Sequence, residues 1–381
     1  MHIKYRCFIF IIVVFLAIGC KKEKLNIVWE INNNKTVVLN EINLDTIKLD
    51  KIEASYVGDI KLWTDSIYFI DKRFCWVFSF DKDGHFIKRM LGQGRGPSEL
   101  NTGLIDCHTR LSNGDHLIVG SGNDCHLFDK NFIRKKTFLI DKGDMRKKGM
   151  DASDFGIYTL MYPKLIFKNN GDKIYFNQFS EYEGYNVVNN PSKYFRECRL
   201  LSEMKLDDGK VCEMYGRYST YYADNDNVKQ VALFSFDIKE NGNFLISFEA
   251  DSLIYEYDNE FNPIEAFGYS GENMNIKYKE LNSLKEFQKY YLVERETKGY
   301  YDWIEYIDEL DMLFRSYKKG DNSSTDGLQI YKSNTMIADV EVPRNLKVIG
   351  FIDPYVYASS TIDEENEEMK VYRFTVPKKN N

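Results

Sequence analysis

A strand–turn–strand pattern recurs six times along the chain and constrains the fold more than any other feature. Alternating apolar runs flank Asp-Gly or Asn-Gly dipeptides, which are strong indicators of β-hairpins; these dipeptides lie at 83–84, 113–114, 170–171, 208–209 and 241–242. The repeated units span residues 54–91, 104–140, 164–215, 231–267, 300–342 and 346–376. Six β units of this size predict an all-β, six-bladed β-propeller, with a β-sandwich as the structural alternative.

The sixth unit has only three predicted strands, so the ring needs a strand from elsewhere. The N-terminal segment offers two, residues 36–39 and 45–49. A strand borrowed from the opposite terminus removes the last free sheet edge, and we expect one of these two to close the ring. Between units four and five, residues 278–296 carry apolar side chains every three to four positions, which predicts one inserted amphipathic helix.

A glycine-rich stretch, GQGRGPSEL at residues 92–100, separates the first two units. Gly92, Gly94 and Gly96 suit a sharply bending chain, and Pro97 prevents a helix at the preceding residue. The stretch lacks the lysine and the spacing of a phosphate-binding loop. We interpret it as a structural crossing between blades, in which Glu99 accepts hydrogen bonds from backbone amides of the turn.

This stretch resembles the G-x-G-x-GP-x-E signature of six-bladed β-propeller lipoproteins of Bacteroidetes, which are similar in shape to NHL-repeat and TolB-type propellers. In that family the signature closes the first blade, which is its place here. The blade pattern behind it covers residues 36–376, nearly the whole chain after the N-terminal segment. The resemblance implies a fold and a compartment more than a chemistry.

The first twenty residues have the form of a bacterial export signal. Basic residues precede an apolar run from Cys7 to Ile18, and Cys20 follows small residues as in a lipobox. We expect residues 1–20 to form a lipoprotein signal ending at lipidated Cys20, residues 21–35 a tether and residues 36–381 the propeller. The alternative is an ordinary cleaved signal with an incidental cysteine. The expected location is the outer membrane, on its periplasmic or its surface face.

Composition limits the partners. The formal charge is −7, and −9 without residues 1–19, so an acidic chain with interspersed signs argues against nucleic acid. Five cysteines remain after the signal, with no zinc-ribbon spacing, and either buried free thiols or a pair within one blade would suit them; they are Cys75, Cys107, Cys125, Cys198 and Cys212. No motif requires a cofactor.

The only candidate metal ligands are three histidines of the second unit. His108, His116 and His126 fall on successive predicted strands. With Asn113-Gly114 as the two central turn residues, His108 is expected opposite Val119 and His116 opposite Leu111. That register does not gather the imidazoles, so we predict no metal site and keep the three as candidates.

Two aromatic clusters are candidate ligand contacts on the propeller rim, or else packing between blades; they contain Tyr218, Tyr221, Tyr222, Tyr301 and Trp303. Carboxylates crowd residues 302–311 and 363–368, but no serine-hydrolase elbow is present. We expect a binding or scaffold module for a glycan, a peptide or an envelope protein, with no catalytic residue assigned. The alternative is a propeller hydrolase or lyase with an acidic site at the central funnel.

Overall fold

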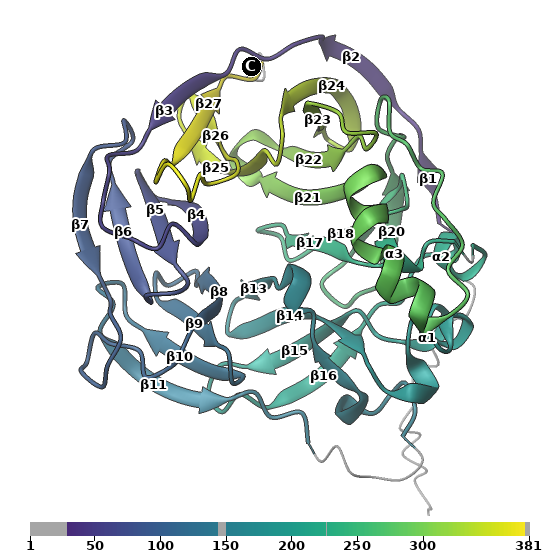
Figure 1. The fold of residues 1–381 in the computed structure, drawn as a ribbon, viewed down its shortest axis with the longest axis horizontal. Coiled ribbons are helices and arrows are strands. Elements are labelled where there is room, and N and C mark those ends of the chain that lie inside the picture. The colour runs from purple at the N-terminus through teal and green to yellow at the C-terminus, as the bar shows by residue number, and fades with distance from the viewer. Residues whose placement is uncertain (1–28, 144–149, 226, 378–381) are drawn as a thin grey trace, which may run out of the picture.

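The computed structural model describes residues 29–143, 150–225 and 227–377, and these form six β-sheets around a central axis (Figure 1). The prediction of an all-β, six-bladed propeller is confirmed. In every blade but the third, the first strand lies nearest the axis; in blade 3 the second strand does (Figure 1).

The strands of blades 1 to 3 are β4 (Gly58–Trp63), β5 (Ser66–Asp71), β6 (Trp76–Phe80) and β7 (Phe86–Met90); β8 (Ile105–Arg110), β9 (His116–Gly120), β10 (Asp124–Phe128) and β11 (Arg134–Leu139); and β12 (Tyr158–Leu160), β13 (Phe167–Asn170), β14 (Lys173–Ser180), β15 (Leu201–Lys205) and β16 (Val211–Tyr215). Those of blades 4 to 6 are β17 (Phe234–Ile238), β18 (Phe244–Phe248), β19 (Ile254–Tyr257) and β20 (Pro263–Phe267); β21 (Tyr300–Ile307), β22 (Met312–Lys318), β23 (Thr325–Lys332) and β24 (Thr335–Pro343); and β25 (Lys347–Ile352), β26 (Tyr355–Ser359) and β27 (Lys370–Phe374).

The N-terminal segment closes the ring and continues around three blades. β3 (Asp45–Lys48) pairs antiparallel with β27, so the second of the two predicted closing segments supplies the missing strand of blade 6. The first, β2 (Lys35–Leu39), pairs in parallel with β24 of blade 5 instead. β1 (Ile31–Asn32), within the segment expected as a tether, pairs in parallel with β20 of blade 4. The segment therefore covers the outer edges of consecutive blades (Figure 1).

An aspartate organises the turn between the third and fourth strands in three blades. Asp81 Oδ1 accepts hydrogen bonds from the backbone amides of residues 83 and 85, both at 2.9 Å. Asp129 and Asp258 bond the equivalent amides of their own turns. Such an Asx turn fixes the reversal locally. The likeness of residues 81–88 to 258–265 in the sequence is thus a real structural repeat.

Two expectations of secondary structure need correction. The third predicted β unit, residues 164–215, contains helix α1 (Pro191–Glu197), which begins at a proline, as helices often do; only β15 (Leu201–Lys205) of the strand expected over residues 195–205 forms. The inserted helix α3 (Leu284–Thr297) lies between blades 4 and 5 as predicted but begins six residues late. Ser283 Oγ caps α3 by accepting a hydrogen bond from Glu286 N. Tyr278 is buried in the extended segment before it.

The remaining helical elements are short: α2 (Thr220–Ala223), and the 3₁₀ turns η1 (Phe155–Ile157), η2 (Tyr162–Lys164), η3 (Glu183–Tyr185), η4 (Lys229–Val231) and η5 (Asp308–Leu310). Over the described ranges, no helix has the length and apolar character that crossing a membrane requires. Apolar side chains fill the spaces between neighbouring blades, and the largest cluster joins blades 3 and 4.

Candidate functional site

A cavity of about 1150 Å³ lies on the propeller axis and is lined by residues of all six blades. Its wall comes mainly from the innermost strands, β4, β8, β13, β17, β21 and β25, whose side chains alternate between the cavity and the space between blades. On β4, for example, Ile60 is buried between blades while Asp59 and Lys61 line the cavity. In the described part of the chain this wall carries eight basic and six acidic side chains.

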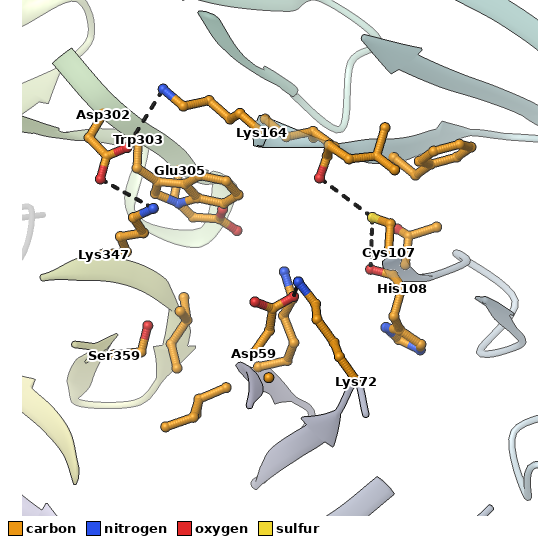
Figure 2. Close-up of a pocket in the computed structure, with 18 of the residues that line it drawn as sticks. Asp59, Lys72, Cys107, His108, Lys164, Asp302, Trp303, Glu305, Lys347 and Ser359 are labelled. Carbon is orange, nitrogen blue, oxygen red and sulfur yellow. Dashed lines mark hydrogen bonds and ion pairs between the residues drawn. The ribbon is translucent and has the colours of Figure 1, made fainter. Parts of the chain in front are cut away.

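Asp302 is the centre of a charge network at one end of the cavity. Lys347 Nζ lies 3.2 Å and Lys164 Nζ 3.6 Å from its carboxylate oxygens (Figure 2). Burial acts in the opposite direction, but these two ammonium groups lower the pKa of Asp302, which stays ionised. Lys164 also contacts the fully buried Glu249 at 2.9 Å, and Arg295 of α3 holds Glu249 through two contacts of 2.6 and 2.8 Å.

Across the cavity, Lys72 Nζ lies 2.9 Å from Asp59 Oδ2, and Figure 2 shows this pair pointing inward from β4 and the loop after β5. Because an ion pair satisfies both groups, neither is left to attract a charged ligand strongly. The negative charge of Asp59 and the positive charge of Lys72 therefore offset each other on this side of the cavity.

Two carboxylates share one ammonium on the opposite part of the wall. Lys168 Nζ lies 2.7 Å from Asp237 Oδ1 and 3.5 Å from Glu305 Oε2. Burial, together with the charge of Asp237, raises the pKa of Glu305 to about 7, although Lys168 acts against the rise. Glu305 is thus able to hold or release a proton near neutral pH.

Trp303 projects into the cavity beside Lys347 (Figure 2). Its indole Nε1 donates a hydrogen bond of 3.2 Å to the carbonyl of Val348, which fixes the ring. Lys61 Nζ lies 5.7 Å and Lys347 Nζ 5.5 Å from the ring centroid, both within cation–π range. The cavity thus combines a fixed aromatic surface with two ammonium groups.

Of the aromatic residues expected on the rim, Trp303 is the one that lines the cavity. Tyr218, Tyr222 and Tyr301 are buried, which favours packing between blades, the second of the two expected roles, for these three rings. Tyr218 and Tyr222 donate their hydroxyls to the carbonyls of residues 232 and 231, so local hydrogen bonds satisfy both. Tyr221 is half-buried against the same core cluster.

Two of the three candidate histidines meet. His108 Nε2 lies 3.1 Å from His116 Nδ1, whereas His126 bonds Asp124 at 2.5 Å elsewhere in the blade. The expected register was wrong by one residue: His116 pairs with Arg110, because a three-residue loop with Gly114 at φ +87° forms the turn. No group of three or more His, Cys, Asp or Glu within the described ranges has a metal-binding arrangement.

The glycine-rich stretch joins β7 to β8 as the crossing between blades 1 and 2. Glu99 Oε2 accepts a hydrogen bond of 2.7 Å from Gly96 N, which confirms the role expected of this carboxylate. Gly94 has φ +147°, and the guanidinium of Arg134 bonds the carbonyl of Gly96 at 3.0 Å. Leu100 N donates to the carbonyl of Gly92 at 2.7 Å, and Pro97 lies in the turn between them. None of its residues lines the cavity.

The remaining expected residues are the cysteines and the carboxylates. Cys20 lies outside the described residues. The five cysteines within them are free, and all but Cys212 are buried. Sequence reasoning singled out the carboxylates of residues 302–311, of which Asp302 and Glu305 line the cavity, but it missed Lys61, Lys168 and Lys347. The available signal was a basic residue in the innermost strand of blades 1, 2, 3 and 6, the strand that lines the axis of a propeller.

Comparisons with known proteins agree with this architecture. A profile of the DUF5128 family, described as a six-bladed β-propeller, matches residues 22–102, which include blade 1 and the glycine-rich crossing. No curated protein matches the chain. A crystal structure of a DUF4221 family member from Bacteroides vulgatus is 11% identical with a TM-score of 0.63, over 89% of this chain and 99% of that one.

A second structure, from Bacteroides fragilis, is named for its expected export; it is 13% identical with a TM-score of 0.51, over 92% of this chain and 99% of that one. Identities this low show a shared fold and nothing of a shared ligand. The chain is a six-bladed β-propeller similar to these Bacteroides proteins.

Proposed function

We propose that this protein is a binding module of the cell envelope whose central cavity receives a saccharide. The observation that carries the proposal is Trp303, held by Val348 on a cavity wall that is otherwise mostly polar. Ligand sites typically combine an aromatic surface with a few placed polar groups. A sugar ring presents both an apolar face for the indole and hydroxyls for the charged side chains around it. A peptide or an envelope protein is the competing ligand.

The experiment is a binding screen on residues 24–381, in which the fluorescence emission of the tryptophans reports binding. A ligand that binds the native state alone also raises the melting temperature. We expect a cell-envelope or dietary oligosaccharide to bind, and Trp303→Ala to weaken that binding at least tenfold, about 1.4 kcal/mol. Trp76→Ala is the matched control, because Trp76 lies on the third strand of blade 1 outside the cavity. If peptides bind and no saccharide does, the proposal of a saccharide ligand is refuted.

An enzyme is the second candidate, and Glu305 is the observation that favours it. A carboxyl group with a pKa of about 7 on a cavity wall has the properties of a general acid or base at neutral pH. Incubation of the bound oligosaccharide with wild type and with Glu305→Gln would decide this. Products that form with wild type and not with the variant would establish a hydrolase or lyase; an unchanged ligand leaves a binding module.

The location belongs to the same proposal. Supporting it are the lipobox-like sequence before Cys20 and the similarity to a Bacteroides fragilis protein named for expected export. We expect lipid on Cys20 and an outer-membrane location. Mass spectrometry of the N-terminal peptide from membranes checks this, with Cys20→Ala as control: an unmodified wild-type peptide would indicate an ordinary secretion signal.

A further inference from the structure

The carboxylates around the cavity are not spread evenly along it. Most are paired with cations: Asp59 with Lys72, Asp302 with Lys347 and Lys164, and Asp237 with Lys168. Of the two acidic lining residues outside these pairs and the Lys168 cluster, Asp106 stands at the start of β8 and Glu364 on an exposed loop. The lining also carries positive charge outside these ion pairs.

Lys61 and Arg110 supply that positive charge. Among the described residues neither side chain forms a hydrogen bond or an ion pair with a carboxylate, and both line the cavity. They come from the innermost strands of neighbouring blades, β4 and β8. Burial lowers the pKa of His108, which lies on the wall with them, and the charges of His116, Lys61 and Arg110 lower it further. Lys61 has acidic neighbours beyond ion-pair distance: burial raises the pKa of Asp59, and Lys72 and Lys61 lower it. An ammonium and a guanidinium that form no hydrogen-bonded ion pair are suited to bind an oxyanion.

Trp303 places this charge beside the proposed sugar surface. Lys61 Nζ is 5.7 Å from the indole centroid, so a ring stacked on Trp303 brings its substituents within reach of the ammonium. Glu305 stands on the same wall, and its raised pKa reduces its negative charge at neutral pH. An acidic group on the ring therefore meets the ammonium of Lys61, which forms no close ion pair, beside a carboxyl group that is partly protonated at neutral pH.

We propose that the ligand is an acidic saccharide, whose carboxylate or sulfate is bound by Lys61 and Arg110 while its ring lies on Trp303. This inference rests on the proposed function and names the class of ligand for the same cavity. It also orients the ligand: the acidic group points away from Asp106, which would repel it at the start of β8.

The test compares three oligosaccharides of equal length at low salt: a neutral one, a uronic-acid one and a sulfated one. We expect one or both acidic ligands to bind wild type about tenfold more tightly than the neutral ligand, as a charge-assisted contact would produce. Lys61→Gln should abolish this preference by weakening the acidic ligands much more than the neutral one, and Lys61→Arg should retain it. Lys88→Gln, on the exposed outer strand β7, is the matched control.

The outcomes separate this inference from the function on which it rests. Equal affinity of wild type for neutral and acidic oligosaccharides, or an unchanged preference in Lys61→Gln, refutes the acidic ligand and leaves saccharide binding intact. If none of the three oligosaccharides binds, both proposals are refuted. Both are also refuted if oligoglutamate, tested beside them as an acidic peptide, is the only ligand that binds. A preference for the uronate identifies a carboxylate ligand, and a preference for the sulfated sugar a sulfate ester. Melting curves verify that each variant is folded.

Discussion

His108 and His116 share one hydrogen bond of 3.1 Å inside blade 2, and both imidazoles are almost completely buried. The pair is covered by aromatic rings: Trp63 lies 4.6 Å from His108, and Phe132 stacks on His116 at 4.1 Å between centroids. Such a bond requires an N–H on one ring and a free lone pair on the other. Protonation of the accepting ring would leave two donors facing each other.

We therefore predict that this pair destabilises the fold in acid. Burial lowers the pKa of His108 well below its usual value and that of His116 to about 4. Between pH 6.5 and 4 the unfolded histidines bind protons that the folded ones do not, so stability is lost as pH falls through this range. For His116 the loss amounts to roughly 3 kcal/mol.

Urea unfolding at several pH values from 7.5 to 4.5 measures this loss. His116→Gln should be less stable at neutral pH but should show a shallower pH dependence than wild type. His85→Gln is the control, because His85 is exposed and lies outside the pair. Parallel pH profiles for wild type and His116→Gln would contradict the prediction.

Glu305 should have the opposite effect. Because its pKa is raised to about 7, the folded protein holds a proton there that the unfolded chain releases near pH 4.5. Stability is consequently lost as pH rises from 4.5 through 7, on the order of 2–3 kcal/mol. Glu305→Gln keeps the Lys168–Asp237 pair at 2.7 Å and should be more stable than wild type at pH 8.5.

The measurement is the difference in unfolding free energy between pH 5.5 and 8.5. Glu364→Gln, at the exposed mouth of the same cavity, should behave as wild type. If Glu305→Gln and wild type lose equal stability over this range, the carboxyl group titrates normally and the second functional candidate loses its support.

Local sequence signals predicted the architecture well because hairpin turns are local. Asp83-Gly84 predicted its turn correctly, and the aspartates Asp81 and Asp258 bind the same amides in two different blades. Ring closure was also foreseeable, since a sixth unit with three strands requires a fourth. The parallel pairing of β2 and β1 was not, because their partners lie far away in sequence.

The site was predicted less well because it depends on register and on which face of a strand looks inward. A turn one residue longer than expected brought His108 to His116. Tyr301 and Trp303 stand two residues apart but on different sides, because a bulge in β21 falls between them; Tyr301 is buried, and Trp303 enters the cavity. Alternation alone would have placed both on one face.

Gly94→Ala should disrupt the crossing between blades 1 and 2. Gly94 has φ +147°, and a Cβ atom there would lie 2.1 Å from Glu99 Oε2, the atom that binds Gly96 N. We expect a loss of about 1–3 kcal/mol from the strained backbone alone. Gly103→Ala is the control, since no atom lies within 4 Å of its added Cβ. Equal thermal midpoints for the two variants would show that the crossing tolerates a side chain.

The N-terminal strand β3 should contribute most of the stability of ring closure. Ile47 pairs with Val371 of β27 and is 6% exposed, and the carbonyl of Gly84 in blade 1 accepts a hydrogen bond from Asp50 N just after β3. This segment thus joins the last blade to the first. Ile47→Ala should cost about 2–4 kcal/mol by urea unfolding. Val38→Ala, on β2 and 58% exposed, should change stability by at most about 0.5 kcal/mol. Similar losses of unfolding free energy for the two variants would contradict this prediction. They would mean that β2 and β3 contribute equally to stability, although only β3 lies in the sheet of blade 6.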